Sequence, residues 1–159
     1  MSTYNFNEMP HEDLNQNFDM INAGSPPLNL LVKAMGGDMV FKCTPATAAP
    51  SAAAAAAADV EYTVTVTLES AAGEVHSWYN GPVLLAISDD DDNGNATISP
   101  AAGEHNMTNG ELEVTVTLPK ASWTAGKAVT LTVSDPATAG TGICGWVVAN
   151  KTFVATLGA

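Results

Sequence analysis

The chain has 159 residues, which is enough for one domain of ordinary size with an additional segment but not for two full domains. Its 17 acidic and 5 basic residues give a net charge of −12, which repels phosphate backbones and anionic lipid and makes nucleic acid and membrane surfaces poor partners. The first residues lack a basic region followed by an apolar stretch, so we expect no signal peptide and synthesis in a cytoplasm.

Residues 10–24 predict a short helix with one apolar face. Pro10 and the acidic residues after it are typical of a helix start, because they suit the first turn and the positive end of the helix dipole. Leu14, Phe18 and Ile21 then recur at helical spacing. An isolated helix of this length is marginal in water, so its apolar face needs a surface. That surface is either the rest of this chain or another protein, and we favour another protein.

Residues 28–35 and 38–43 are apolar runs joined by Gly36 and Gly37, which predicts a β-hairpin. The run at 28–35 is far shorter than the ~20 residues of a membrane-spanning helix. A lone hairpin is not independently stable in water. We therefore interpret residues 1–44 as an anchoring segment that another surface completes.

Residues 45–58 combine prolines with seven consecutive alanines, Ala52 to Ala58, and are interpreted as a linker. Alanine has the best helix propensity, whereas Pro45 and Pro50 prevent a helix from extending back through them. The segment is either a flexible tether or one or two helical turns that several chains bring together. We favour a plain spacer.

From residue 59 to residue 159 apolar and polar residues alternate, which predicts strands with one buried face. The clearest runs are 60–69, 111–118 and 129–133, with further candidates at 74–79, 83–88, 96–99, 143–148 and 151–156. Short strands at this spacing indicate an immunoglobulin-like antiparallel β-sandwich, with a small barrel as the alternative. Trp78 and Trp146 are the expected core anchors.

The run Asp89-Asp90-Asp91-Asp92-Asn93-Gly94-Asn95 is the densest polar cluster. It matches the first half of a calcium loop, but the twelfth position is Pro100, which offers no carboxylate. A hydrated turn on Asn93-Gly94 is favoured, calcium held with ligands from other loops is the alternative, and no metal or cofactor is predicted.

Nothing in the sequence predicts catalysis. His11, His76 and His105 belong to different elements, and His76 is interpreted as a partly buried, hydrogen-bonded side chain. Cys43 and Cys144 lack the spacing of a redox or metal motif and are expected to be free thiols, with a disulfide as the alternative. No nucleophile elbow, zinc-protease motif or phosphate-binding loop occurs, so we predict that the protein is not an enzyme.

Three stretches resemble the Ig-like domains of tailed-bacteriophage head fibre and capsid decoration proteins. They are residues 62–68, residues 72–81 with the sequence AGEVHSWYNG, and residues 147–153 with the sequence VVANKTF. The block at 72–81 is distinctive, whereas the Thr/Val strands are generic. The resemblance covers about residues 60–157.

The resemblance implies a virion structural protein at the capsid surface, whose amino-terminal segment binds the major capsid protein while the β domain projects outward. In that arrangement the anchoring residues supply apolar surface on a segment without a core of its own. They are Tyr4, Phe6, Leu14, Phe18 and Ile21. We favour a homotrimer, because the alanine run can pack closely around an axis and fibres of this kind are often threefold.

Two other functions remain open. One is a phage tail or baseplate component that carries the same Ig-like module and attaches to the host. The other is a carbohydrate-binding or adhesin module that uses Trp78, Tyr79 or Trp123 beside the acidic loop. Sugar binding requires aromatic side chains exposed to solvent, so the burial of these residues decides whether that alternative keeps its support.

Overall fold

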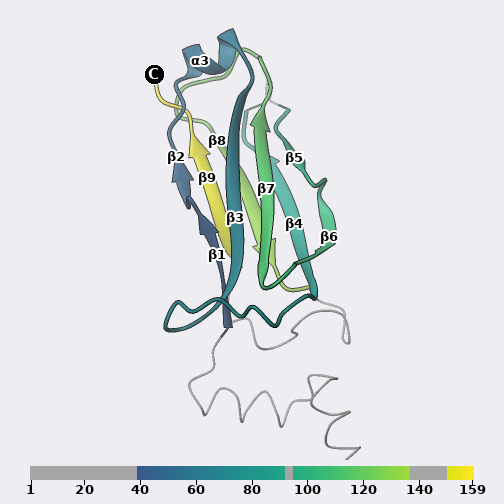
Figure 1. The fold of residues 1–159 in the computed structure, drawn as a ribbon. Helices are drawn as coiled ribbons and strands as arrows, with labels where there is room; N and C mark the ends of the chain where they lie inside the picture. Colours follow the sequence, from purple (N-terminus) through teal and green to yellow (C-terminus); the bar gives the residue numbers. More distant parts are fainter. Residues whose placement is uncertain (1–38, 92–94, 137–149) are drawn as a thin grey trace, which may run out of the picture.

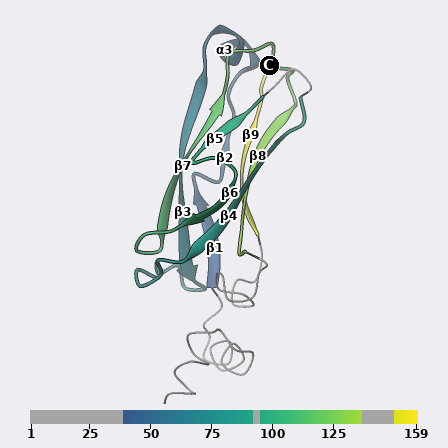
Figure 2. The same cartoon turned by 90° about the vertical axis from the view of Figure 1, so that its right-hand side faces the viewer.

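The computed structural model describes residues 39–91, 95–136 and 150–159, and these residues form two β-sheets packed face to face (Figures 1 and 2). One sheet has four strands in the order β1-β3-β7-β5, and the other has five in the order β2-β9-β8-β4-β6. The elements are β1 Met39–Thr44, β2 Thr47–Ala48, α3 Ala52–Ala57, β3 Val60–Ser70, β4 Pro82–Asp89, β5 Thr97–Ser99, β6 Gly103–Asn106, β7 Glu111–Leu118, β8 Ala128–Ser134 and β9 Lys151–Thr156.

The strand order is that of an immunoglobulin domain. If β1, β3, β4, β5, β7, β8 and β9 are taken in chain order as strands A to G, the two sheets contain ABED and CFG. The short strands β2 and β6 extend the second sheet beyond β9 and β4. The pairings between these named strands are antiparallel except that of β2 with β9. The predicted fold class is therefore confirmed: the chain is mainly β, with an Ig-like β-sandwich.

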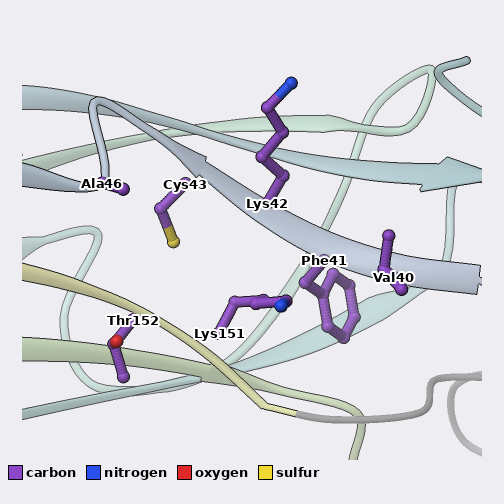
Figure 3. Close-up of a pocket in the computed structure, with 7 residues that line it drawn as sticks. All are labelled: Val40, Phe41, Lys42, Cys43, Ala46, Lys151 and Thr152. Carbon is purple, nitrogen blue, oxygen red and sulfur yellow. The ribbon is translucent and has the colours of Figure 1, made fainter. Parts of the chain in front are cut away.

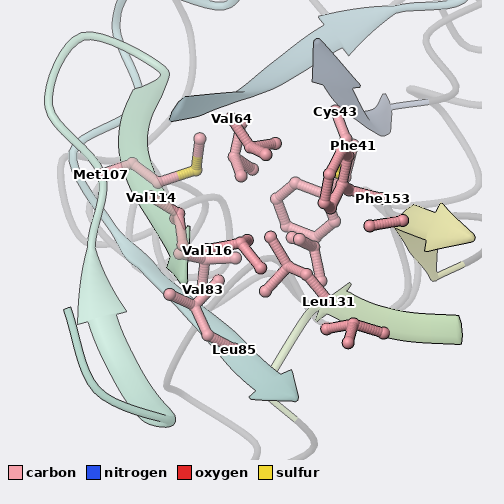
Figure 4. Packing of buried hydrophobic residues seen from close by; sticks show 14 of the residues in the cluster. Phe41, Cys43, Val64, Val83, Leu85, Met107, Val114, Val116, Leu131 and Phe153 are labelled. Carbon is pink, nitrogen blue, oxygen red and sulfur yellow. The ribbon is translucent and has the colours of Figure 1, made fainter. Parts of the chain in front are cut away.

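The core lies between the sheets and is built by strand alternation. Val64 and Val66 of β3 are fully buried, as are Val114 and Val116 of the neighbouring strand β7, where Val114 lies opposite Val64. These side chains meet residues of the second sheet, such as Phe153 of β9 (Figure 4). The strands predicted at 60–69, 83–88, 96–99, 111–118, 129–133 and 151–156 are all present within a few residues of the expected bounds.

The sandwich begins earlier than the predicted boundary at residue 59. Strand β1 pairs antiparallel with β3, with Met39 opposite Ser70 and Thr44 opposite Thr65. Phe41 of β1 is fully buried, and Met39 and Cys43 are nearly so. The prediction that residues 1–44 are separate from the sandwich is thus wrong for residues 39–44, because alternate side chains of β1 complete the core along the open edge of β3.

The predicted linker is also part of the domain. The chain crosses from one sheet to the other at the cis peptide bond between Thr44 and Pro45, and β2 then pairs with β9. The side chain of Ser51 caps α3 by accepting a hydrogen bond of 3.1 Å from the Ala54 backbone N–H. Ala55 is fully buried, and its carbonyl accepts a hydrogen bond from the backbone N–H of Ala121. The alanine run therefore closes one end of the sandwich, and the interpretation as a plain spacer is wrong.

Several predictions lie outside the described residues. They are the helix at 10–24, the hairpin arm at 28–35, the strand at 143–148, Trp146 and Cys144. Within the described ranges, β6 was missed because its Gly103-Glu104-His105-Asn106 sequence has no apolar alternation. No helix in the part that the structure describes is long and apolar enough to cross a bilayer.

Candidate functional site

The five predicted anchoring residues, Tyr4, Phe6, Leu14, Phe18 and Ile21, lie outside the described residues. The structure does define the end of the sandwich at which their segment joins. Met39 lies opposite Ser70, the last residue of β3, so the chain enters next to the loop 71–81 that connects β3 to β4 (Figure 1). We call this end, with loops 71–81 and 107–110, the proximal end. The distal end carries α3, loop 119–127 and Gly158.

Loop 71–81 is not the strand predicted at 74–79. A single bridge joins Val75 to Glu69, and the rest of the segment turns under the sandwich. Backbone hydrogen bonds hold the turn: the His76 N–H donates to the Leu68 carbonyl at 2.8 Å, and the Tyr79 N–H donates to the His76 carbonyl at 2.9 Å. Strand β7 pairs with β3 only as far as Thr67, so the loop bonds to the short remaining end of β3 and then turns.

Loop 107–110 fixes loop 71–81 from the other side. The Gly110 N–H donates to the Tyr79 carbonyl at 2.7 Å, and the Asn109 N–H donates to the Asn80 side chain at 2.9 Å. Gly110 has a φ of 75°, and a Cβ at this position would lie 2.5 Å from the His76 carbonyl oxygen. Glycine is therefore required for this close approach of the two loops.

Tyr79 anchors loop 71–81 to the body of the domain. Its ring is buried, and its hydroxyl donates a hydrogen bond of 2.7 Å to the Pro82 carbonyl. Burial raises the pKa of the Tyr79 hydroxyl, and the nearby carboxylates of Asp135 and Glu104 raise it further. Tyr79 therefore stays neutral and serves as a structural anchor of the loop.

Trp78, next to Tyr79, points the other way and is 58% exposed. The prediction that Trp78 is a core anchor is wrong, because residues 74–79 form a loop in which Tyr79, and not Trp78, is buried against the domain. Of the two described tryptophans, Trp123 is the buried one, and its indole N–H donates to the Pro119 carbonyl at 2.9 Å. Val75 of the same loop is also exposed, so loop 71–81 presents two apolar side chains at the proximal end.

His76 supports this surface from behind. Its ring centroid lies 5.6 Å from that of Trp78, and the Tyr79 ring lies 5.9 Å from Trp78 in an edge-on arrangement. The His76 Nε2 atom is buried and has no hydrogen-bond partner in the described part of the chain. His76 is partly buried, as predicted, but the predicted hydrogen bond of its ring is not made at Nε2.

The proximal end is acidic. Glu74 lies in loop 71–81, and Glu111 begins β7 directly after loop 107–110. Glu104 and Asp135 lie close enough to Tyr79 to raise the pKa of its hydroxyl. Of the described lysines, Lys120 and Lys127 lie in loop 119–127 at the distal end. Lys42 is paired with Glu69 at 3.3 Å, and Lys151 faces the side of the sandwich between β1 and β9.

A groove of about 290 Å³ lies on that side, between β1 at the edge of one sheet and β9 of the other (Figure 3). Phe41 and Cys43 line it from β1, and Lys151 and Thr152 line it from β9. Burial raises the pKa of the Cys43 thiol to about 11, against a smaller lowering by the Lys151 charge. Cys43 is a free, buried thiol that stays protonated near neutral pH, so the groove offers no activated nucleophile.

At the distal end, the acidic cluster binds backbone groups of its own domain. Asp89 accepts from the Ala96 N–H, Asp90 from the Ala128 N–H and Asp91 from the Thr124 N–H, at 3.0, 2.6 and 2.5 Å. Among the described residues, no three His, Cys, Asp or Glu side chains are grouped as a metal site would require. Residues 92–94 of the predicted turn lie outside the described ranges.

No family model matches the chain, and no curated protein matches it. Among solved structures, it is similar to WR4, a Caenorhabditis elegans MSP family member, with a TM-score of 0.43 and 10% identity over 74% of this chain and 97% of that one. It is also similar to SSP-19, an MSP-domain protein like family member of Caenorhabditis elegans, with a TM-score of 0.41 and 19% identity over 74% and 99%.

A third similar structure is a GH5 xyloglucanase of Bacteroides ovatus, in complex with a XXXG heptasaccharide. The TM-score is 0.41 and the identity 9%, over 74% of this chain and 19% of the xyloglucanase. At TM-scores this low, none of the three likenesses carries an argument about function. The assignment of the fold rests on the strand order described above.

Proposed function

We propose that this protein is a virion structural protein, a capsid decoration or head fibre protein of a tailed bacteriophage. Residues 1–38 anchor it to the major capsid protein at the capsid surface, and the Ig-like sandwich projects outward. The resemblance of residues 62–68, 72–81 and 147–153 to such proteins is the first support for this proposal. The protein acts by binding and display, without a catalytic step.

The arrangement of the two ends supports the proposal. The chain enters at the proximal end beside Ser70, whereas Gly158 pairs with Ser51 at the distal end. The described core is composed of residues from Met39 to Leu157. A domain with its own core, attached through one end, is the architecture that a displayed module needs. This is the observation on which the proposal depends.

We further propose that the protein assembles as a homo-oligomer, with a trimer favoured. The alanine run gives less support to a trimer than the sequence suggested, because Ala55 packs against its own domain. Several copies on one shell would bind with avidity through their repeated anchors. The net charge of −12 favours solubility at high local concentration and argues against nucleic acid or membrane as the surface bound.

The proposal is tested by sedimentation with empty shells purified from the particle that carries the protein. The full chain should sediment with the shells, and a variant lacking residues 1–38 should remain in the supernatant while keeping its β circular dichroism. Sedimentation of the shortened variant at the level of the full chain would contradict the proposal. Labelling of intact particles separates a capsid location from the alternative of a tail or baseplate.

Sugar binding is a second candidate function, and the exposure of Trp78 favours it. Glycan-binding modules use exposed aromatic rings, and Trp78 is 58% exposed, whereas Tyr79 and Trp123 are buried. Within the described residues, Trp78 is therefore the tryptophan able to stack on a sugar ring. Titration with soluble oligosaccharides, followed through the Trp78 indole resonance, tests this candidate.

A further inference from the structure

We propose that Trp78 and Val75 form a second contact surface for the protein partner at the proximal end, and that an arginine or lysine side chain of the partner stacks on the Trp78 indole. This inference rests on the proposed function, because it identifies the chemistry of the surface on which the protein is anchored. The contact lies in the sandwich itself and is additional to the proposed anchor in residues 1–38.

Trp78 lies on a loop whose conformation is fixed by contacts with the rest of the domain. The loop is fixed by the His76 and Tyr79 backbone hydrogen bonds, by the Tyr79 hydroxyl and by the close approach of Gly110. The indole is further supported by the rings of His76 and Tyr79 at 5.6 and 5.9 Å. An exposed aromatic side chain that is already ordered loses little entropy on binding, and tryptophan is enriched among the residues that dominate binding energy.

The charge around this surface selects a cationic partner. Glu74, Glu104, Glu111 and Asp135 lie toward the same end as Trp78, and they outnumber Lys42 and Lys151, which lie in the same half of the sandwich. A cation placed over an indole ring is attracted by the ring, and nearby carboxylates add to that attraction. A second copy of this chain, with its charge of −12, is repelled from the same surface.

The position of Trp78 beside the start of β1 places it within reach of the anchored surface. Loop 71–81 begins at the residue after Ser70, and Ser70 lies opposite Met39, where residues 1–38 join the sandwich. Once the anchor is bound, the proximal end is held at high local concentration against the shell, so even a weak contact forms. The Trp78 contact then determines the orientation of the sandwich relative to the shell.

The first test uses a tetra-arginine peptide with blocked ends, titrated into the full chain at low salt. The chain has three tryptophans, so the indole N–H resonance of Trp78 is assigned by its loss in Trp78→Phe. We expect the Trp78 resonance to move with tetra-arginine but not with tetra-glutamate. The affinity for tetra-arginine, measured by calorimetry for each variant, should fall by about two- to fivefold in Trp78→Ala. Leu84→Ala, which removes an exposed apolar side chain from β4, is the matched control and should bind as the parent does.

The second test measures sedimentation of Trp78→Ala and Leu84→Ala with empty shells at low and high salt. Trp78→Ala should bind more weakly than Leu84→Ala, and the difference should shrink at high salt. If the full chain fails to bind shells, the proposed function falls. If the full chain binds and Trp78→Ala binds equally well, only the present inference is overturned. Movement of the Trp78 resonance with oligosaccharides and not with tetra-arginine would overturn it in favour of sugar binding.

Discussion

The two ends of the sandwich differ in how completely their side chains are paired within the domain. At the distal end, Asp89, Asp90 and Asp91 bind backbone N–H groups, and the Trp123 indole is buried and hydrogen-bonded. At the proximal end, Trp78 is exposed and the ring Nε2 of His76 has no partner among the described residues. A domain that closes one end and leaves apolar surface on the other is suited to bind through the second end.

The largest expected effect separates the sandwich from the segment that precedes it. Deleting residues 1–38 should leave a cooperative thermal transition, whereas deleting residues 1–45 should abolish it, because β1 and the buried side chains of Met39, Phe41 and Cys43 are lost. Each such side chain contributes about 1.5–3 kcal/mol, and the sum approaches the whole stability of a small domain. Circular dichroism against temperature measures both variants. Equal melting of the two would show that β1 is not part of the core.

The two described tryptophans provide the next contrast. Trp123→Ala removes a buried ring and its hydrogen bond at the distal end, so we expect a loss of about 3–5 kcal/mol in the free energy of unfolding. Urea denaturation measures the change. A loss below about 1 kcal/mol would mean that the distal end is not packed as described.

Gly110→Ala tests whether the proximal loops are held together. The new methyl group would meet the His76 carbonyl, and the φ of 75° is unfavourable for alanine, so we expect a loss of about 2–3 kcal/mol. Gly126→Ala is the matched control, since Gly126 also has a positive φ but open space around it, and about 1 kcal/mol is expected. Equal losses in the two variants would argue against the close contact between loops 71–81 and 107–110.

Cys43 lies in β1, between the two ends of the sandwich. Its buried thiol predicts how the free energy of unfolding depends on pH. Its folded pKa of about 11 lies above the ordinary thiol value of 9.0, so the folded state favours the neutral thiol. This contribution is complete below pH 9, and it is lost as the pH rises to about 11, because the unfolded chain releases the proton first. The loss amounts to about 2–3 kcal/mol. Cys43→Ala should lack this component, and parallel pH profiles of parent and variant would contradict the assignment.

The smallest expected effect is that of Trp78→Ala on stability. An exposed side chain without a hydrogen bond contributes little to the fold, so the free energy of unfolding should change by less than about 0.5 kcal/mol. Thermal and urea denaturation are the measurements. A change of several kcal/mol would show that Trp78 belongs to the core, and its proposed role in binding would lose its basis.

The sequence predicted the parts of the fold in which local pattern and tertiary environment agree. The strands β3, β7 and β8 alternate with one buried face, so their period alone identified them. Strand β1 was assigned to an anchor because the Gly-Gly pair suggested a local hairpin, while its true partner β3 lies far along the chain. The alanine run gave no sign of which residue is buried, and only the packing against loop 119–127 reveals Ala55.

The candidate surface was harder to predict because it depends on a turn. Residues 74–79 alternate as a strand does, which placed Trp78 in the core. The run Asn80-Gly81-Pro82 after it is typical of a turn, and that signal could have shifted the assignment toward a loop. The pairing of Tyr79 with Pro82 and of Gly110 with His76 cannot be read from sequence, since both depend on loops meeting at one end of the sandwich.

The most direct test of the central claim is hydroxyl-radical footprinting of the full chain, free in solution and bound to empty shells. Trp78 should be oxidised readily in the free protein and protected on the shell, whereas the exposed surface around α3 should react equally in both states. Protection of the α3 end with unchanged oxidation of Trp78 would contradict the account, because the domain would then face the shell with the opposite end.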